Sequence, residues 1–143
     1  GVKVLQAAPA DPDGETGAGV IGVLPEAMPR AAFLAKVKET FGAGCVLHNE
    51  PSEGPEAIGK VALCGGAGSF LAEEAEAQGA DAFVTGEIKY HDFFGHEGIL
   101  LAAIGHFESE RFTTELFTKI MGEAFPGLPV AVTTAETNPI KYM

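Results

Sequence analysis

A histidine and a glutamate stand four positions apart in the segment Gly105-His-Phe-Glu-Ser-Glu110, between an apolar run and an amphipathic stretch. On a helical wheel, His106 and Glu110 fall on or beside the apolar face, whereas Glu108 falls on the solvent face. Two ionisable groups that face inward need a partner, because burying an unpaired charge is costly. An imidazole beside a carboxylate suits several divalent metals. The spacing therefore predicts His106 and Glu110 as metal ligands and Glu108 as a surface charge.

The same pair has a simpler interpretation. A histidine and a glutamate at this spacing occur by chance in many helices, and two ligands do not complete a metal site. If the helix begins only at Glu108, the wheel no longer places His106, and the pairing then depends on the geometry of the turn. The pair therefore needs support from the elements around it.

Those elements alternate along the chain between apolar runs and amphipathic stretches. Strands that are apolar at nearly every position are typical of a largely parallel sheet with helices on both faces. We predict an α/β three-layer sandwich with a largely parallel sheet, and a mixed sheet is the alternative. The expected strands and short apolar runs cover residues 2–8, 20–24, 45–48, 61–64, 82–85, 99–104 and 130–134, and the expected helices cover about 29–41, 69–78 and 106–124.

Loops that follow parallel strands emerge at one edge of a sheet, so three loops should meet beside the His–Glu pair. In the first, Gly65, Gly66 and Gly68 let backbone amides approach an anion. In the second, Lys89 could hold a phosphate and His91 could shuttle a proton. Glu87 could orient either of these two side chains. The five glycine, lysine and histidine residues are candidate substrate-binding residues, and a tight turn and a solvated connector are the alternatives.

Composition limits the class of protein further. The 143 residues fit one domain, and the formal net charge of −11 argues against binding to nucleic acid. No apolar run is long enough to span a bilayer, and the start of the chain does not have the pattern of a signal peptide. Cys45 and Cys64 lie in apolar segments without metal-ligand spacing, so we expect reduced, buried thiols in a cytoplasmic protein, with a disulfide as the alternative.

Three segments then resemble a known family by their order and spacing. They are Lys60-Val-Ala-Leu-Cys-Gly-Gly-Ala-Gly-Ser-Phe-Leu71, Thr85-Gly-Glu-Ile-Lys-Tyr-His-Asp92 and Ile104-Gly-His-Phe-Glu-Ser-Glu110. Together they resemble the C-terminal part of the Nif-three-like proteins, also called GTP cyclohydrolase 1 type 2 homologs, and the segments at 17–26 and 137–139 fit as well. On this basis residues 1–18 are a linker or the end of a preceding segment, and residues 19–143 are the C-terminal α/β domain.

The resemblance implies a site for two divalent metal ions per subunit, of zinc, iron or manganese, in a ring-shaped homo-oligomer that is often a hexamer. The family's Gly-His-x-x-x-Glu ligands correspond to His106 and Glu110. Family members also carry an adjacent histidine pair and an aspartate ligand in an N-terminal half, and this sequence has no His-His pair. We therefore expect a C-terminal portion that holds part of a split site, binds metal poorly alone and does not catalyse by itself.

Three functions remain open at this point. The parent protein is a metal-dependent hydrolase that acts on a nucleotide-like substrate, or a non-enzymatic metal-binding scaffold or regulatory protein. The third alternative sets the family aside: a monomeric flavodoxin-like domain that binds a small anion at the glycine turn without metal. GTP ring-opening is the activity that the family name suggests, but none of these residues specifies guanine.

Overall fold

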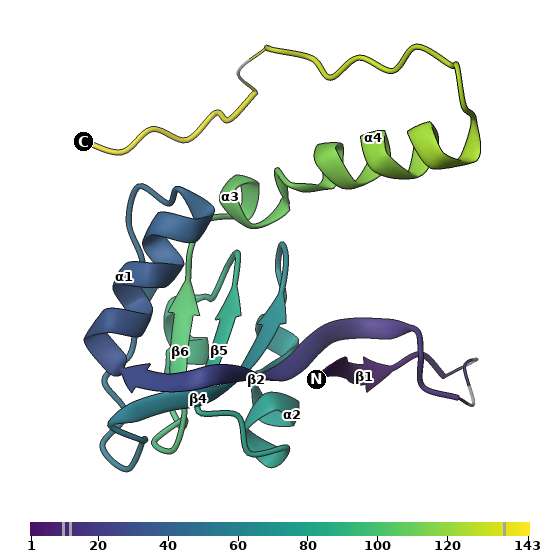
Figure 1. The fold of residues 1–143 in the computed structure, drawn as a ribbon. Helices are drawn as coiled ribbons and strands as arrows, with labels where there is room; N and C mark the ends of the chain where they lie inside the picture. The colour runs from purple at the N-terminus through teal and green to yellow at the C-terminus, as the bar shows by residue number, and fades with distance from the viewer. Residues whose placement is uncertain (10, 12, 136) are drawn as a thin grey trace.

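The computed structural model describes residues 1–9, 11, 13–135 and 137–143. These residues form a six-stranded sheet in the order β1-β2-β4-β5-β6-β3 (Figure 1). The strands are β1 (Val2–Ala7), β2 (Gly17–Pro29), β3 (Leu47–His48), β4 (Ala57–Cys64), β5 (Ala82–Thr85) and β6 (Leu100–Ala103). The helices are α1 (Arg30–Phe41), α2 (Ala72–Ala77), α3 (His106–Glu110) and α4 (Thr113–Ala124), with the 3₁₀ turns η1 (Ser69–Leu71) and η2 (Tyr90–Phe93).

The centre of the sheet is parallel and its flanks are antiparallel. β4, β5 and β6 run parallel, whereas β1 and β2 on one side and β3 on the other join antiparallel. Every residue of β5 and β6 is buried, because side chains of successive residues enter two separate cores. Phe83 packs with the core beneath α2, and Val84 packs with the core beneath α1. The predicted α/β layers are confirmed, with the sheet in its mixed form.

The helix predicted at residues 29–41 is confirmed, because its boundaries are set by local signals. Pro29 stands at the N-cap, and Gly42 ends the helix with a φ of 59°, in the left-handed region that favours glycine. The amides of Gly42 and Ala43 donate to carbonyl oxygens of the last turn. Phe33 and Val37 are the buried residues of α1.

Two expected elements differ in the structure. The helix expected at 106–124 is divided into α3 and α4, and at the break the Thr113 hydroxyl donates to the Glu110 carbonyl oxygen at 2.6 Å. The strand expected at 130–134 was wrong: this stretch is exposed and irregular, after Pro126 and Pro129. A strand forms only where it can pair with the edge of a sheet, and the apolar residues of this stretch did not show whether such an edge lies close to it.

Several strand and helix boundaries also differ from the predicted ones. β2 continues past Pro25 because its register with β4 shifts between Val23 and Met28, and proline is tolerated at such an irregularity. The helix expected from Ser69 begins as the 3₁₀ turn η1, and the Ser69 hydroxyl donates to Asp92 Oδ2 at 3.0 Å instead of capping the helix.

Cys45 is exposed and Cys64 is half-buried, so the prediction of two buried thiols was wrong, and both are free cysteines.

The first residues of the chain take part in the sheet. β1 pairs with β2 from Val2 opposite Gly22 to Ala7 opposite Gly17, and Leu5 is buried in the core. The division of the chain at residue 18 stays a prediction. Among the described residues, the helices are all too short or too polar to cross a bilayer.

Candidate metal centre

The loops that follow β4, β5 and β6 meet at one edge of the sheet. The amide of Gly66, after β4, donates to Ser109 Oγ on α3 at 2.9 Å. The carbonyl oxygen of Gly66 accepts from the amide of Glu87, after β5, at 3.1 Å. Gly105, after β6, donates its amide to the carbonyl oxygen of Gly86 at 3.0 Å. The predicted meeting of three loops at the carboxyl ends of the parallel strands is therefore present.

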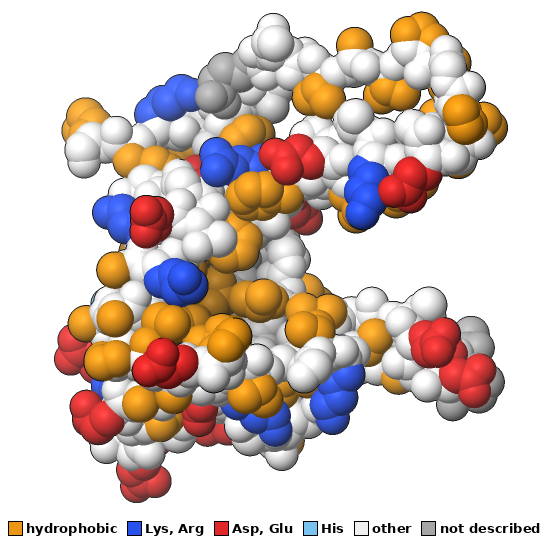
Figure 2. Space-filling model, in the orientation of Figure 1, with side chains coloured by type: hydrophobic (Ala, Val, Ile, Leu, Met, Phe, Trp, Pro, Cys, Tyr) orange, Lys and Arg blue, Asp and Glu red, His pale blue; other side chains and the backbone are white. Residues whose placement is uncertain are grey.

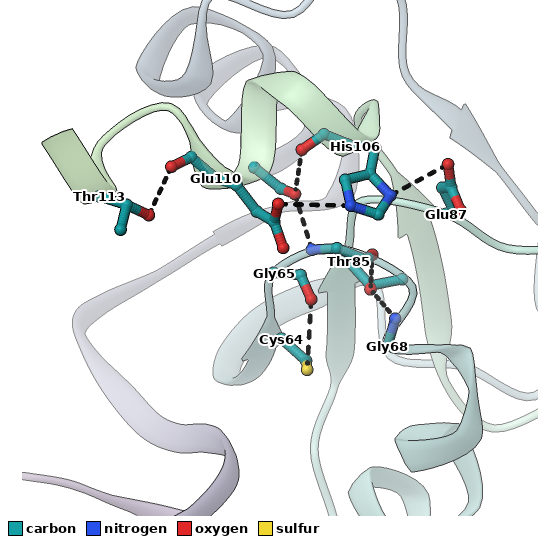
Figure 3. A network of polar contacts seen from close by, with 10 residues as sticks. Cys64, Gly65, Gly68, Thr85, Glu87, His106, Glu110 and Thr113 are labelled. Carbon is teal, nitrogen blue, oxygen red and sulfur yellow. Dashed lines mark hydrogen bonds and ion pairs between the residues drawn. The ribbon is translucent and has the colours of Figure 1, made fainter.

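His106 lies between two carboxylates at this edge (Figure 3). Its Nε2 is 3.3 Å from Glu110 Oε2, one helical turn further on, and its Nδ1 is 3.1 Å from Glu87 Oε1. All three side chains are about half exposed, so a solute can reach them. The structure thus brings together the two residues expected as metal ligands and adds Glu87, which the sequence suggested only as a partner of Lys89 or His91.

The exposures expected for two glutamates on α3 are reversed. Glu108 is only 6% exposed, whereas Glu110 is exposed, so the prediction of Glu108 as a surface charge was wrong. The helical wheel assumed one continuous helix, whereas α3 ends at Glu110 and α4 begins at Thr113. The apolar face of α4 therefore does not predict which side chains of α3 are buried. Glu108 Oε1 accepts a hydrogen bond from Asn138 Nδ2 at 3.1 Å, and the Tyr142 hydroxyl also bonds to this carboxylate.

The C-terminal segment completes a pocket beside His106. The pocket has a volume of about 470 Å³ and is lined by Glu87, His106, Phe107, Glu110, Arg111, Asn138, Pro139 and Ile140. Glu108 holds this segment in place through Asn138 and Tyr142. One wall of the pocket therefore comes from the loop after β5 and from α3, and the other comes from the C-terminal segment.

Gly66 passes directly beneath the His–Glu pair. Its φ of +64° lies in the left-handed region, and a Cβ at this position would be 2.5 Å from Glu110 Oε1. The amides of Gly66 and Gly68 donate to Ser109 Oγ and Thr85 Oγ1, respectively. These contacts favour the tight-turn interpretation of the glycine loop, and the role of Gly65, Gly66 and Gly68 in anion binding stays a prediction.

Lys89 and His91 lie on the connector between β5 and β6. Both are exposed, and the His91 ring packs edge-on against Tyr90. Neither is among the described residues that line the pocket of His106 and Glu110. The structure does not bring them to the His–Glu pair, and their substrate-binding roles stay predictions.

Two further ionisable groups do not belong to the His106–Glu110 pair. Burial raises the pKa of the Cys64 thiol, and the nearby charge of Glu110 raises it further. The Cys64 thiol is therefore harder to ionise than a free thiol, which makes it a weaker nucleophile. His96, which precedes β6, has a side chain only 12% exposed, and its Nδ1 is 2.8 Å from Glu76 Oε2 on α2.

The donor set at His106 suits a divalent metal in type but not in number. Imidazole nitrogen and carboxylate oxygen are common ligands of zinc, iron and manganese. The described residues contain no group of three or more histidine, cysteine, aspartate or glutamate side chains arranged to hold a metal. His106 and Glu110 can therefore supply part of a coordination shell.

Fold and site together define an α/β protein with a histidine and a glutamate on the helix that follows its last parallel strand. Residues 2–139 match the family described as Duf34/NIF3 (NGG1p interacting factor 3), and the chain belongs to this family. A relative from Staphylococcus epidermidis, named GTP cyclohydrolase 1 type 2 homolog, is 30% identical over 135 residues, which are 91% of this chain and 36% of the relative. A relative of the same name from Staphylococcus aureus is 31% identical, over 89% of this chain and 36% of its own length.

Solved structures share the fold. Staphylococcus aureus protein SA1388 matches with a TM-score of 0.74 and 28% identity, over 89% of this chain and 42% of SA1388. A Bacillus cereus protein related to NIF3 matches with a TM-score of 0.71 and 23% identity, over 89% of this chain and 36% of that one, which is a likeness of fold alone. The chain spans about a third of the length of the curated relatives it matches.

Proposed function

We propose that this chain supplies His106 and Glu110 to a divalent-metal site whose other donors lie in the remainder of a Duf34/NIF3 protein. The observation that carries the proposal is the approach of His106 Nε2 to Glu110 Oε2 at 3.3 Å, on half-exposed side chains that line a pocket. The share of its relatives that this chain covers, 36%, leaves room for the missing donors. A complete site holds two ions of zinc, iron or manganese.

Such ions would supply Lewis acidity and an activated water to a hydrolytic reaction. The residues of this chain do the positioning: His106 and Glu110 hold one side of the site, and Gly66 allows the loop to pass beneath them. We propose a small anionic or nucleotide-like substrate, in line with the name GTP cyclohydrolase 1 type 2 homolog that the relatives carry. The parent protein is then a metal-dependent hydrolase of the cytoplasm.

The second candidate is a non-enzymatic metal-binding scaffold or regulatory protein that acts as a ring-shaped homo-oligomer, such as a hexamer. The exposed apolar residues of α4 favour it, because an uncovered apolar surface promotes association. A turnover screen with nucleotides on a metal-loaded, full-length protein that contains this sequence separates the two. Turnover that requires His106 supports the hydrolase, and failure in the fully loaded protein supports the scaffold.

The metal site itself is tested by calorimetric titration of the chain with zinc and with manganese. We expect weak binding, because two protein donors leave the other positions to water. His106→Ala and Glu110→Gln should abolish it, while His48→Ala, at an exposed histidine on β3, should leave it unchanged. Tight stoichiometric binding that survives His106→Ala would overturn the assignment.

A further inference from the structure

We infer that Glu87 is a positioning residue for His106: it accepts the Nδ1 proton and so keeps Nε2 free to bind a cation beside Glu110. This inference rests on the proposed metal site. The two carboxylates approach opposite nitrogens of one imidazole, Glu87 at 3.1 Å and Glu110 at 3.3 Å, as Figure 3 shows. A single metal ion cannot bind both nitrogens, so the two glutamates have different tasks.

The backbone holds Glu87 in place for this contact. Its amide donates to the Gly66 carbonyl oxygen, and the carbonyl oxygen of the preceding residue, Gly86, accepts from the amide of Gly105, directly before His106. Gly86 is buried, and a Cβ there would be 2.6 Å from the Gly66 carbonyl oxygen and from Ser109 Oγ. The start of the Glu87 side chain is therefore fixed relative to the start of α3.

A neutral imidazole carries one N–H, and two ionised carboxylates can only accept it. If Nε2 carries the proton, it donates to Glu110, and both groups are then unavailable to a metal. If Nδ1 carries the proton, it donates to Glu87, and a lone pair on Nε2 faces the carboxylate of Glu110. That second arrangement is completed by a cation between Nε2 and Glu110. A carboxylate behind a ligating histidine acts in this way in many metal sites.

The role of Glu87 differs from the one the sequence suggested. The sequence placed Glu87 near Lys89 and His91, its neighbours along the chain, and gave no sign of His106. Lys89 and His91 do not line the pocket, whereas Glu87 does. Of these three residues, Glu87 is the one placed to act through His106.

The first readout needs no metal. In protein labelled with ¹⁵N-histidine, the imidazole shifts of neutral His106 report which nitrogen carries the proton, and His106→Asn identifies its signals among the four histidines. We expect the Nδ1–H form in the native chain and a shift toward the Nε2–H form in Glu87→Ala. Glu73→Gln, which removes one exposed carboxylate on α2, should change nothing. An Nε2–H form in the native chain, or a tautomer unchanged in Glu87→Ala, would overturn the inference.

The second readout is zinc affinity. Removing a carboxylate that orients a ligating histidine costs about 10–100-fold in metal affinity, and we expect the lower end because these side chains are half exposed. Unchanged affinity in Glu87→Ala, together with loss of binding in His106→Ala, overturns the positioning role alone. Zinc binding that His106→Ala leaves intact overturns the proposed metal site, and the tautomer measurement still decides the contact between Glu87 and His106.

Discussion

At the scale of single residues, Gly66 determines how closely the glycine loop approaches His106 and Glu110, the pair proposed to bind metal. We expect Gly66→Ala to lower the free energy of unfolding by about 1–2 kcal/mol, because an L-residue at positive φ is strained by that amount. Its Cβ would also displace the carboxylate of Glu110 and so weaken zinc binding. Chemical denaturation and zinc titration measure the two effects.

Gly65→Ala is the matched control. A Cβ at Gly65 meets its nearest neighbour, the Ser109 carbonyl oxygen, at 3.5 Å, which is ordinary contact. This variant should keep both stability and zinc affinity close to those of the native chain. Equal effects of the two substitutions would contradict the special role of Gly66.

Tyr142 reports on the docking of the C-terminal segment. Burial raises the pKa of the Tyr142 hydroxyl, and the negative charges of Glu108 and Cys45 and the hydrogen bond to Glu108 raise it further. Since the folded pKa is raised, the contribution of Tyr142 to docking is complete below about pH 10 and is lost as the pH rises through the folded value.

The titration of Tyr142 can be followed by absorbance, because the chain has two tyrosines and no tryptophan. In Tyr90→Phe we expect a midpoint above the ordinary tyrosine value of about 10. Adding Glu108→Gln should lower the midpoint without restoring the ordinary value, because burial remains. A midpoint that does not respond to Glu108→Gln would contradict the contact between Tyr142 and this carboxylate.

At the scale of elements, Asn49 covers the edge of β6 beyond the short strand β3. Its side-chain amide donates to the carbonyl oxygens of His96 and Ile99 at 3.2 and 3.1 Å and accepts from the Leu101 amide at 2.7 Å. Asn49→Ala leaves these groups without partners, so we expect a loss of about 1–3 kcal/mol in the free energy of unfolding.

Asn49→Asp tests the same contacts by replacing the donating amide group with a carboxylate oxygen, which repels the two carbonyl oxygens. The aspartate keeps an acceptor for Leu101 but turns a second oxygen toward two carbonyl oxygens, so it should destabilise at least as much as alanine in urea unfolding. Glu50→Ala, at the exposed neighbouring position, should stay within about 0.5 kcal/mol of the native chain. Stability of Asn49→Asp above that of Asn49→Ala would contradict the donor role.

The elements also show what the sequence could predict. α1 was predictable because Pro29 and Gly42 mark its ends locally, and the parallel strands were predictable because they are apolar throughout. The pairing of His106 with Glu110 followed from their spacing. By contrast, the burial of Glu108 depends on Asn138 and Tyr142, and the partner of Glu87 lies on another loop. Contacts between distant segments leave no periodic pattern, so these features required the structure.

At the scale of the whole molecule, α4 and the C-terminal segment stand apart from the arm of β1 and β2, with an apolar hollow between them (Figures 1 and 2). On α4, Leu116 and Phe117 are 55% and 61% exposed. A pocket of about 570 Å³ opens at the sheet edge, with Val20, Leu63 and Ile104 among its lining residues. The predicted apolar face of this helix is therefore present but uncovered by the described residues.

We expect this face to make the chain associate as its concentration rises, as measured by sedimentation velocity. Leu116→Gln should shift the chain toward monomer without lowering its melting temperature, because the side chain is exposed. Glu115→Gln, at the preceding position, should leave association unchanged. A lower melting temperature with unchanged association in Leu116→Gln would show that the helix is packed within one chain.

The two walls of the pocket at His106 differ in how firmly the backbone holds them. The wall that carries Glu87 and His106 follows β5 and β6, whose residues are all buried and whose amides should exchange with solvent most slowly. The opposite wall, at Asn138–Ile140, lies in a segment without helix or strand, and its contact with Glu108 is made by side chains. Brief local opening should therefore begin at the C-terminal segment. A solute would then enter from that side while His106, Glu87 and Glu110 keep their positions relative to one another.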